Sequence, residues 1–409
     1  MINSDIAIIG GGASGLLCGI AAARKNKNKK IIIIEKESRV GKKLLATGNG
    51  RCNLTNTTIS ENNYSGSFSS EINNTFSEFT SDYIIKYFES IGIICKADSE
   101  GRVYPLSDQA SSVLDLIRTE LLHLNVEEHC TMTVKSITNR NNIFQINCGE
   151  TTFTAKKIVI ASGGKSTPNL GSDGSGFMLL KQLGIRVNPT YPGLAPIKCS
   201  ESYLKSLKGV RCKCEVNLIA DNKIIKKEKG ELQFTENALS GICIYNLSCF
   251  INELLTKKTV NGEKKEAIYI SVDLFPDFSE DQLSKFLNER LKKFPNFTLE
   301  NYLTGVINKR LHSVVFKQLN IQSYEQINAD KIAGLLKKWR FTPIKISDYF
   351  ASQVTCGGVG SDEINPKTME SKKVKNLYII GEAVDINGDC GGYNLHWAFS
   401  SGILAGENL

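Results

Sequence analysis

The sequence lacks the features that mark membrane, secreted and metal-binding proteins. No apolar run approaches the length of a membrane span, and residues 1–5 lead straight into a strand, so we expect no signal peptide and a cytoplasmic protein. The twelve cysteines contain no Cys-x-x-Cys pair, which argues against a dithiol reductase and for reduced thiols. With four histidines, and Cys212 and Cys214 as the one close cysteine pair in the sequence, we expect no metal site.

What is present begins with a dinucleotide-binding strand, turn and helix. An apolar strand, 6–9, runs into Gly10, where the turn is too tight for a Cβ. Gly12 lets the backbone approach a pyrophosphate, and Gly15 lets the next helix pack against the strand. That helix, predicted over 14–25, directs its N-terminal N–H groups at the phosphates.

A second strand, 31–34, ends at Glu35, which is placed to accept hydrogen bonds from a ribose diol. A nicotinamide-only dehydrogenase would continue with closely spaced βαβ repeats, whereas this chain enters a Gly-rich, basic loop over 39–53. Lys43 and Arg51 there can neutralise phosphate charge, and the loop's glycines let the backbone lie against a flat ring. The pattern favours a longer cofactor, although a solvated surface loop is the alternative.

The C-terminal segment supplies the other half of such a site. Residues 374–383 predict a buried strand that ends at a glycine, and Asp385 follows on a loop. Residues 390–402 predict a turn that opens a final helix. In flavoproteins of the two-dinucleotide type a late strand carries an acid to the ribityl chain, and the N-terminus of the following helix stabilises negative charge on the reduced flavin. Alone, this stretch could be a packing helix with a Gly-Gly turn.

A second strand-GxGxxG-helix unit is absent from the sequence. The glycines at 171, 174 and 176 do not follow a strand, so we predict a loop there and no resident nicotinamide domain. NAD(P)H, if it serves as a transient co-substrate, must then visit the same face of the flavin that the substrate uses.

Four stretches, 48–56, 161–166, 363–370 and 391–395, carry a resemblance to a known family. They resemble the aminoacetone oxidase family of FAD-binding proteins, which also includes a flavoprotein reductase of dehydrogenated bile-acid intermediates. The resemblance covers nearly the whole chain and implies non-covalent FAD as the cofactor. It implies that the FAD is lined by Gly10, Gly12, Ser14, Gly15, Glu35, Lys36, Lys43, Gly50, Arg51, Asn53, Val134, Gly163, Gly381, Asp385, Gly392, Tyr393, Asn394 and Leu395. We add their neighbours Ala13, Cys52, Ala161, Ser162, Glu382 and Gly391.

The chain departs from the family's pattern in two places. Glu236 stands where the family commonly has His after Phe-Thr, and the Leu-Ser-Gly run that follows continues with Ile242 where the family has Pro. His396 stands where the family often has Gln. The first departure lies in the expected substrate domain, so it affects the substrate and not FAD binding.

We predict an α/β fold: a two-dinucleotide-binding-type FAD domain, with a Rossmann-like parallel sheet and a β-meander, and an inserted β-rich plus helical substrate domain. The FAD domain is discontinuous, over 1–189 and 345–409, and the insertion or cap is 190–344. Within the insertion we expect a β-rich part, 190–275, and a helical part, 276–338. The expected meander strands are 130–137, 143–148 and 151–155; those of the insertion are 209–219, 223–234 and 267–273; its helices are 279–293, 305–319 and 329–338.

The net charge of +8 has a plain explanation in the composition. The basic stretches 25–30, 223–229 and 257–265 are interleaved with Asn, Glu and Ile, which is typical of solvated faces in a Lys-, Asn- and Ile-rich chain. No basic run interleaved with aromatics is present. We therefore expect a small-molecule substrate and no membrane partner, with an RNA-associated flavoprotein as the less favoured alternative; the oligomeric state stays open.

For chemistry we expect hydride transfer at flavin N5, because the cofactor carries the reaction and the protein orients it. The catalytic candidates are Tyr393, Asn394, His396 and Cys390, with Cys52 and Cys356 also expected near the ring. His396 either orients a substrate or makes a packing contact. We expect a reductase, fed by NAD(P)H, of a small or steroid-like unsaturated carbonyl compound. The alternatives are an oxidase of a small amine such as aminoacetone, which uses oxygen, and a flavin-bound protein for redox sensing or RNA association.

Overall fold

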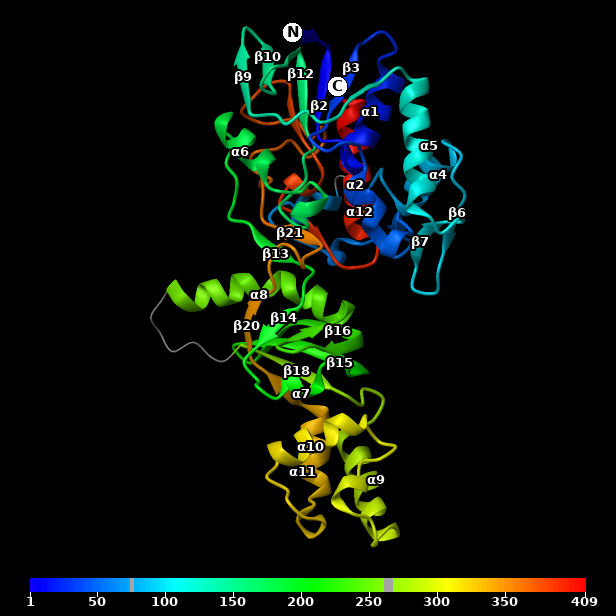
Figure 1. The fold of residues 1–409 in the computed structure, drawn as a ribbon, viewed down its shortest axis with the longest axis vertical. Helices are drawn as coiled ribbons and strands as arrows, with labels where there is room; N and C mark the ends of the chain where they lie inside the picture. The colour runs from blue at the N-terminus through cyan, green and yellow to red at the C-terminus, as the bar shows by residue number, and fades with distance from the viewer. Residues whose placement is uncertain (74–76, 261–267) are drawn as a thin grey trace. The chain divides into compact units, whose positions relative to one another are not determined.

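The structure, a computed structural model, describes residues 1–73, 77–260 and 268–409. It divides into two compact units, which we call unit 1, Met1–Gly193 with Tyr349–Leu409, and unit 2, Leu194–Asp348 (Figure 1). The insertion was predicted over 190–344, so both of its predicted boundaries lie a few residues before those of unit 2. That unit 2 is a substrate domain stays a prediction.

Unit 1 is built on a five-stranded parallel sheet in the order β22-β12-β2-β3-β8. Its central strands are Ile-rich and buried on both faces, as strands in a parallel sheet covered by helices must be. Edge strand β8 was missed, because it consists of two glutamates and a histidine. The strands are β2 (Ile6–Ile9), β3 (Ile31–Ile34), β8 (Glu127–His129), β12 (Lys157–Ile160) and β22 (Leu377–Ile379).

The predicted meander is present as a four-stranded sheet, but its first strand is displaced. Strand β9 begins at Ser136 and not at residue 130. The reason is that the N–H groups of Thr131 and Met132 donate to the carbonyls of Glu37 and Glu35, so this stretch is held against the chain that follows β3. The sheet contains β1 (Ile2–Asn3), β9 (Ser136–Arg140), β10 (Ile143–Asn147) and β11 (Thr152–Ala155).

Helices α1 and α12 of unit 1 lie where the sequence predicted a helix, whereas helix α2 falls within the predicted loop 39–53. The glycines at 171, 174 and 176 were predicted to lie in a loop. Gly171 and Gly174 precede helix α6, which begins at Ser175, so Gly176 lies in a helix. The helices are α1 (Ala13–Lys25), α2 (Lys42–Ala46), α4 (Ser81–Glu89), α5 (Ala110–His123), α6 (Ser175–Gln182) and α12 (Tyr393–Glu407). Small sheets pair β4 (Thr55–Asn56), β7 (Arg102–Pro105) and β6 (Cys95–Ala97); β5 (Tyr64–Ser65) and β23 (Asn387–Gly388); β13 (Tyr191–Gly193) and β21 (Val354–Cys356).

Unit 2 is a seven-stranded antiparallel sheet with helices. The strand order is β19-β18-β15-β16-β17-β14-β20. The strands are β14 (Ile197–Cys199), β15 (Arg211–Ala220), β16 (Lys223–Phe234), β17 (Ala238–Ser240), β18 (Tyr269–Asp273), β19 (Trp339–Phe341) and β20 (Pro343–Ile346). The helices are α7 (Leu204–Leu207), α8 (Ile242–Val260), α9 (Glu280–Lys293), α10 (Lys309–Gln318) and α11 (Ala329–Lys337).

Helix α8 corrects the prediction that 190–275 is β-rich throughout. Its residues Cys243, Ile244, Leu247 and Ile251 are buried in the core of unit 2. The ends of two predicted segments, 257–265 and 267–273, fall outside the described residues, which omit 261–267. In the part of the chain that is described, no helix is long and apolar enough to cross a membrane.

Candidate functional site

The turn between β2 and α1 has the geometry that its glycines predict. Gly10 has a φ of +108°, and a Cβ there would lie 2.5 Å from the carbonyl oxygen of Ala161. A Cβ on Gly15 would lie 2.1 Å from the carbonyl oxygen of Gly10, so helix and strand meet backbone to backbone. A Cβ on Gly12 would meet nothing within 4 Å, and Gly12 caps α1 without any side chain. The N-terminus of α1 is therefore open to an anion.

Glu35, at the carboxyl end of β3, is held in one orientation by backbone N–H groups. Its Oε2 accepts a hydrogen bond from Gly11 N at 2.7 Å, and its Oε1 accepts one from Glu37 N at 2.8 Å. A carboxylate has about four acceptor positions, so capacity for a ribose diol remains.

A pocket lies beside this carboxylate and contains several predicted cofactor residues. Lys36 forms part of its wall and pairs with Asp173 at 2.6 Å. The pocket is lined by Ile9, Gly10, Ile34, Glu35, Lys36, Met132, Thr133, Val134, Ser162, Gly171, Ser175 and Leu179. The pocket thus brings together residues 9–10, 34–36, 132–134, 162 and 171–179. That it binds adenosine stays a prediction.

Two buried oxygen atoms of predicted cofactor residues have no hydrogen-bond partner among the described residues: Ser162 Oγ and Asn53 Oδ1. Buried polar groups are nearly always hydrogen-bonded, so an unpartnered one points to a ligand. Ser162 lines the pocket beside Glu35. Asn53 Oδ1 lies 2.7 Å from the position of a Cβ on Gly392. With the open cradle at Gly12, these atoms fit a bound FAD.

The N-terminus of α12 resembles that of α1 in being capped by glycine. Gly391 and Gly392 have φ values of +131° and +103°, and a Cβ on Gly392 would lie 2.5 Å from the carbonyl oxygen of Thr55. No side chain caps this helix. Nearby in the chain, Asp385 is buried, and its Oδ2 accepts from Ser67 Oγ at 2.7 Å and Asn188 Nδ2 at 3.1 Å.

Lys43 lies in a polar network. Its Nζ is 2.8 Å from Glu382 Oε2 and donates to the carbonyl of Ser166 at 3.1 Å. Glu382 Oε1 accepts from Thr355 N at 2.9 Å, and Thr355 Oγ1 accepts from Ser166 N at 3.0 Å. The network joins four segments of the chain, and the Lys43 charge is balanced within it. A contact of Lys43 with phosphate stays a prediction.

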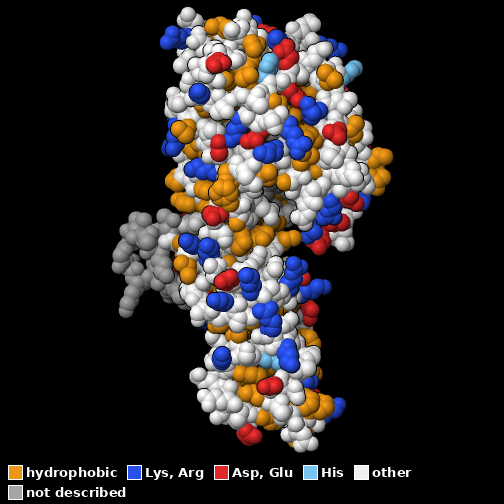
Figure 2. All heavy atoms as spheres, viewed as in Figure 1, with side chains coloured by type: hydrophobic (Ala, Val, Ile, Leu, Met, Phe, Trp, Pro, Cys, Tyr) orange, Lys and Arg blue, Asp and Glu red, His pale blue; other side chains and the backbone are white. Residues whose placement is uncertain are grey.

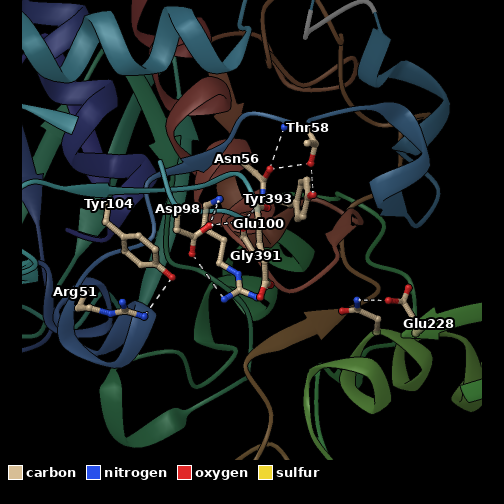
Figure 3. A network of polar contacts seen from close by, with 11 residues as sticks. Arg51, Asn56, Thr58, Asp98, Glu100, Tyr104, Glu228, Gly391 and Tyr393 are labelled. Atoms are coloured by element: carbon tan, nitrogen blue, oxygen red, sulfur yellow. Dashed lines mark hydrogen bonds and ion pairs between the residues drawn. The ribbon is translucent and has the colours of Figure 1, made fainter. Parts of the chain in front are cut away.

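Arg51 stacks on a tyrosine. Its guanidinium carbon lies 4.3 Å from the centre of the Tyr104 ring (Figure 3). Cys52 follows with a φ of +63° and is fully buried, and burial raises the pKa of its thiol to about 12. Cys52 is therefore protonated and closed to solvent. A catalytic thiolate at this position is not supported.

Tyr393 ends a hydrogen-bond chain that starts at Asn56 (Figure 3). Asn56 Nδ2 donates to the carbonyl of Gly391 at 2.9 Å, and its Oδ1 accepts from Thr58 Oγ1 at 2.8 Å. Thr58 Oγ1 lies 3.0 Å from Tyr393 Oη. The carboxamide of Asn56 thereby fixes both the turn before α12 and the phenol of Tyr393.

Two other catalytic candidates use their polar atoms in backbone contacts. Asn394 Oδ1 accepts from Gly388 N at 2.9 Å, and its Nδ2 donates to Gly388 O at 2.8 Å. His396 is fully buried, with Nδ1 2.8 Å from Thr55 Oγ1 and Nε2 2.9 Å from the carbonyl of Phe79. Burial lowers its pKa to about 3, so it is neutral. Of the two roles considered for His396, the structure favours packing.

The twelve cysteines all lie in the described residues, and none of them forms a disulfide. Cys356 is buried, and Cys390 is half-buried with Sγ 3.8 Å from Gln353 Oε1. The described residues contain no cluster of His, Cys, Asp and Glu that could hold a metal ion. Among the catalytic candidates, the Cys390 thiol and the Tyr393 hydroxyl contact side chains, those of Gln353 and Thr58.

The remaining predicted residues lie in the same turns. Gly163 and Gly381 have positive φ values, and a Cβ on Gly381 would lie 2.5 Å from Ser14 Oγ. A Cβ on Gly50 would meet open space, and Leu395 packs against the core of unit 1. The prediction missed the pocket residues Met132, Thr133, Gly171, Ser175 and Leu179. The glycines at 171 and 174 were the available signal, since they precede a helix that faces this pocket.

The parallel sheet, the glycine turn and the anchored acid define a Rossmann-type FAD-dependent oxidoreductase. Residues 4–408 match the family described as HI0933-like protein Rossmann domain, and the chain belongs to this family.

Two curated proteins match the chain over its whole length. It is 34% identical over 408 residues to the 3-dehydro-bile acid delta(4,6)-reductase of Clostridium scindens, with 98% of each chain covered. It is 30% identical over 412 residues to the ribosomal RNA dihydrouridine synthase of Escherichia coli, with 100% of this chain and 98% of that protein covered. The solved 3-ketosteroid delta1-dehydrogenase of Sterolibacterium denitrificans is 11% identical with a TM-score of 0.51, and 99% of each chain is covered. That similarity shows the fold alone.

Proposed function

We propose that this flavoenzyme reduces a carbon–carbon double bond conjugated to a carbonyl group, with NADH or NADPH as the electron donor. The observation that carries the proposal is the full-length similarity to two proteins whose names both describe such a reduction. A Δ4 double bond beside a 3-oxo group is conjugated to it. The double bond that a uridine loses on becoming dihydrouridine is likewise conjugated to a ring carbonyl.

FAD, when bound and reduced, supplies the hydride for this chemistry. The chain contributes the N-terminus of α12, whose first N–H groups have no side-chain cap and carry the positive end of the helix dipole. Negative charge that develops against this end is stabilised without reorganisation. The same end would also stabilise a reduced flavin in an oxidase, so the electron acceptor needs a direct test.

Reduction of a conjugated double bond also needs a proton at the second carbon. Tyr393 and Cys390 carry transferable protons next to the α12 turn, and the Thr58 hydroxyl fixes the phenol of Tyr393. We expect Tyr393→Phe or Cys390→Ser to lower the rate of substrate reduction while reduction by NAD(P)H proceeds at the wild-type rate. A proton from solvent would leave both variants fully active.

The electron donor is tested by mixing the oxidised protein anaerobically with NADH or NADPH and following the visible flavin band. Bleaching by either one supports a reductase with ping-pong kinetics. Absence of bleaching by both, with rapid bleaching by aminoacetone, would establish the amine oxidase instead.

The two relatives indicate two substrate candidates with the same reacting group. The first is a steroid-like 3-oxo-Δ4 compound, as in the relative at 34% identity. The second is a uridine of ribosomal RNA, as in the relative at 30% identity. They differ in what they need from the rest of the protein, because only RNA requires a wide cationic surface.

A further inference from the structure

Unit 2 carries one sheet face that helix α8 does not cover. On β15, Cys214, Val216 and Leu218 are buried against the core, and a Cβ on Gly230 of β16 would lie 3.3 Å from Cys243 Cβ on α8. Helix α8 therefore packs on this inner face. Because side chains alternate along a strand, the residues between these point to the opposite face.

The register of the sheet identifies the residues of that opposite face. Arg211, Lys213, Glu215 and Asn217 of β15 stand opposite Gln233, Glu231, Lys229 and Lys227 of β16. Glu215 and Asn217 also stand opposite Asp273 and Ser271 of β18, and Ser271 stands opposite Arg340 of β19. Ile197 of β14 and Ile346 of β20 are buried in the core. Their neighbours Lys198 and Lys345, which pair directly with each other, therefore point to the opposite face as well. We call these residues the open face.

Basic side chains predominate on the open face. They are Lys198, Arg211, Lys213, Lys227, Lys229, Arg340 and Lys345, against the acids Glu215, Glu231 and Asp273. Figure 2, which shows one face of the molecule, has several Lys and Arg side chains over the strands of unit 2.

The three acids of the open face are already paired. Glu215 binds Lys227 at 2.8 Å, Glu231 binds Arg211 at 3.3 Å, and Asp273 binds Lys337 of α11 at 2.6 Å. Among the described residues, Lys198, Lys213, Arg340 and Lys345 have no ion-pair partner.

Two details of the open face favour an anionic partner. Lys198 and Lys345 stand directly opposite each other, and such a pair of like charges destabilises a sheet. The Arg340 guanidinium lies 4.5 Å from the centre of the Tyr269 ring on the neighbouring strand, which gives a flat cationic and aromatic surface. Sheet faces with cationic and aromatic side chains suit the phosphates and bases of RNA.

We propose that the open face of the unit 2 sheet binds the sugar-phosphate backbone of RNA. The proposal rests on the proposed function and selects its RNA substrate, because a steroid-like compound needs no such surface. The partner is recognised by its charge and by stacking, and not by base sequence.

The test compares two triple variants of the full-length, FAD-loaded protein. Lys198→Glu/Lys213→Glu/Lys345→Glu reverses three unpaired charges of the open face. The matched control, Lys285→Glu/Lys309→Glu/Lys331→Glu, makes the same change in net charge at exposed positions of α9, α10 and α11. Binding of a fluorescein-labelled, uridine-containing RNA hairpin is followed by anisotropy over a range of salt concentrations, and the flavin spectrum of each variant confirms that FAD is retained.

We expect the open-face variant to bind RNA at least about tenfold more weakly, with a slope of log K against log salt that is shallower by about two, since each phosphate contact contributes about 0.7 to 0.9. The control variant should bind like wild type. Equal loss in both variants, or loss in neither, would overturn the proposal, and so would binding of phosphatidylglycerol vesicles in place of RNA. If RNA binds as expected but no conjugated double bond is reduced, the proposed function fails and the assignment of the RNA-binding surface stands. If a 3-oxo-Δ4 steroid is reduced but RNA does not bind, the proposed function stands and the assignment of the surface fails.

Discussion

Removal of the Glu35 carboxylate tests whether the pocket beside β3 holds the adenosine half of FAD. The carboxylate is fixed by two backbone N–H groups, from Gly11 at 2.7 Å and Glu37 at 2.8 Å, so it is preorganised for the two hydroxyls of a ribose. Hydrogen bonds to a charged group contribute about 1.5 to 3 kcal/mol each. Loss of two such bonds in Glu35→Ala should weaken FAD binding by about 3 kcal/mol or more, which is at least about 100-fold in Kd.

The assay is titration of the apoprotein with FAD and, separately, with FMN, followed by quenching of flavin fluorescence. FMN lacks adenosine, so its affinity should be nearly the same for Glu35→Ala and wild type. The matched control is Glu37→Ala, which removes a neighbouring carboxylate that pairs with Lys42. We expect this variant to bind FAD with wild-type affinity. Because Glu35 also anchors its own turn, thermal unfolding of each apoprotein verifies that the variant is folded. Wild-type FAD affinity in folded Glu35→Ala would refute the assignment.

The remaining predictions concern the α1 turn, the buried histidine and the Tyr393 network. Gly15→Ala places a Cβ 2.1 Å from the carbonyl of Gly10, so it should abolish FAD retention on purification. In the folded protein His396 has a pKa of about 3 and is neutral. As the pH falls below about 6.5, the imidazole of His396 is therefore protonated in the unfolded state but not in the folded state. Between pH 6.5 and 3 this residue should lower the free energy of unfolding by up to about 1.4 kcal/mol per pH unit. In His396→Gln, urea titrations should show a free energy of unfolding that falls less steeply with pH by that amount. Thr58→Val frees the Tyr393 phenol and should slow substrate reduction with bleaching by NAD(P)H unchanged in stopped flow; equal slowing of both half-reactions would contradict a positioning role.

The cofactor cradle could be predicted from sequence because its parts are local. Gly10, Gly12 and Gly15 lie at the junction of one strand and one helix, and a Cβ on Gly15 would meet the carbonyl of Gly10 in that same turn. Glu35 follows at the end of the next strand, which the Ile run made evident. The Gly391-Gly392 turn before the last helix is also visible in the sequence, although the backbone that it meets, at Thr55, is distant.

The parts that escaped prediction depend on contacts between distant segments. Strand β8 has polar residues because it is a sheet edge, so it carries no apolar pattern. Helix α8 mixes apolar and polar residues on its buried positions, such as Leu247 and Ser248, and exposes Ile242, so it lacks a clear amphipathic period. The roles of Thr355 and His396 follow from partners far away in the sequence, and Met132 reaches the pocket through a hydrogen bond to Glu35.

The central claim is that this flavoenzyme reduces a conjugated carbon–carbon double bond. The most direct measurement is a single turnover: the protein is photoreduced without oxygen and mixed anaerobically with either a 3-oxo-Δ4 bile acid or a uridine-containing ribosomal RNA, while the flavin band and the mass of the product are followed. We expect that at least one of these compounds restores the oxidised flavin band and gains two hydrogens, and that the RNA does so. A reduced flavin that persists with both compounds and is reoxidised only by oxygen would contradict the account.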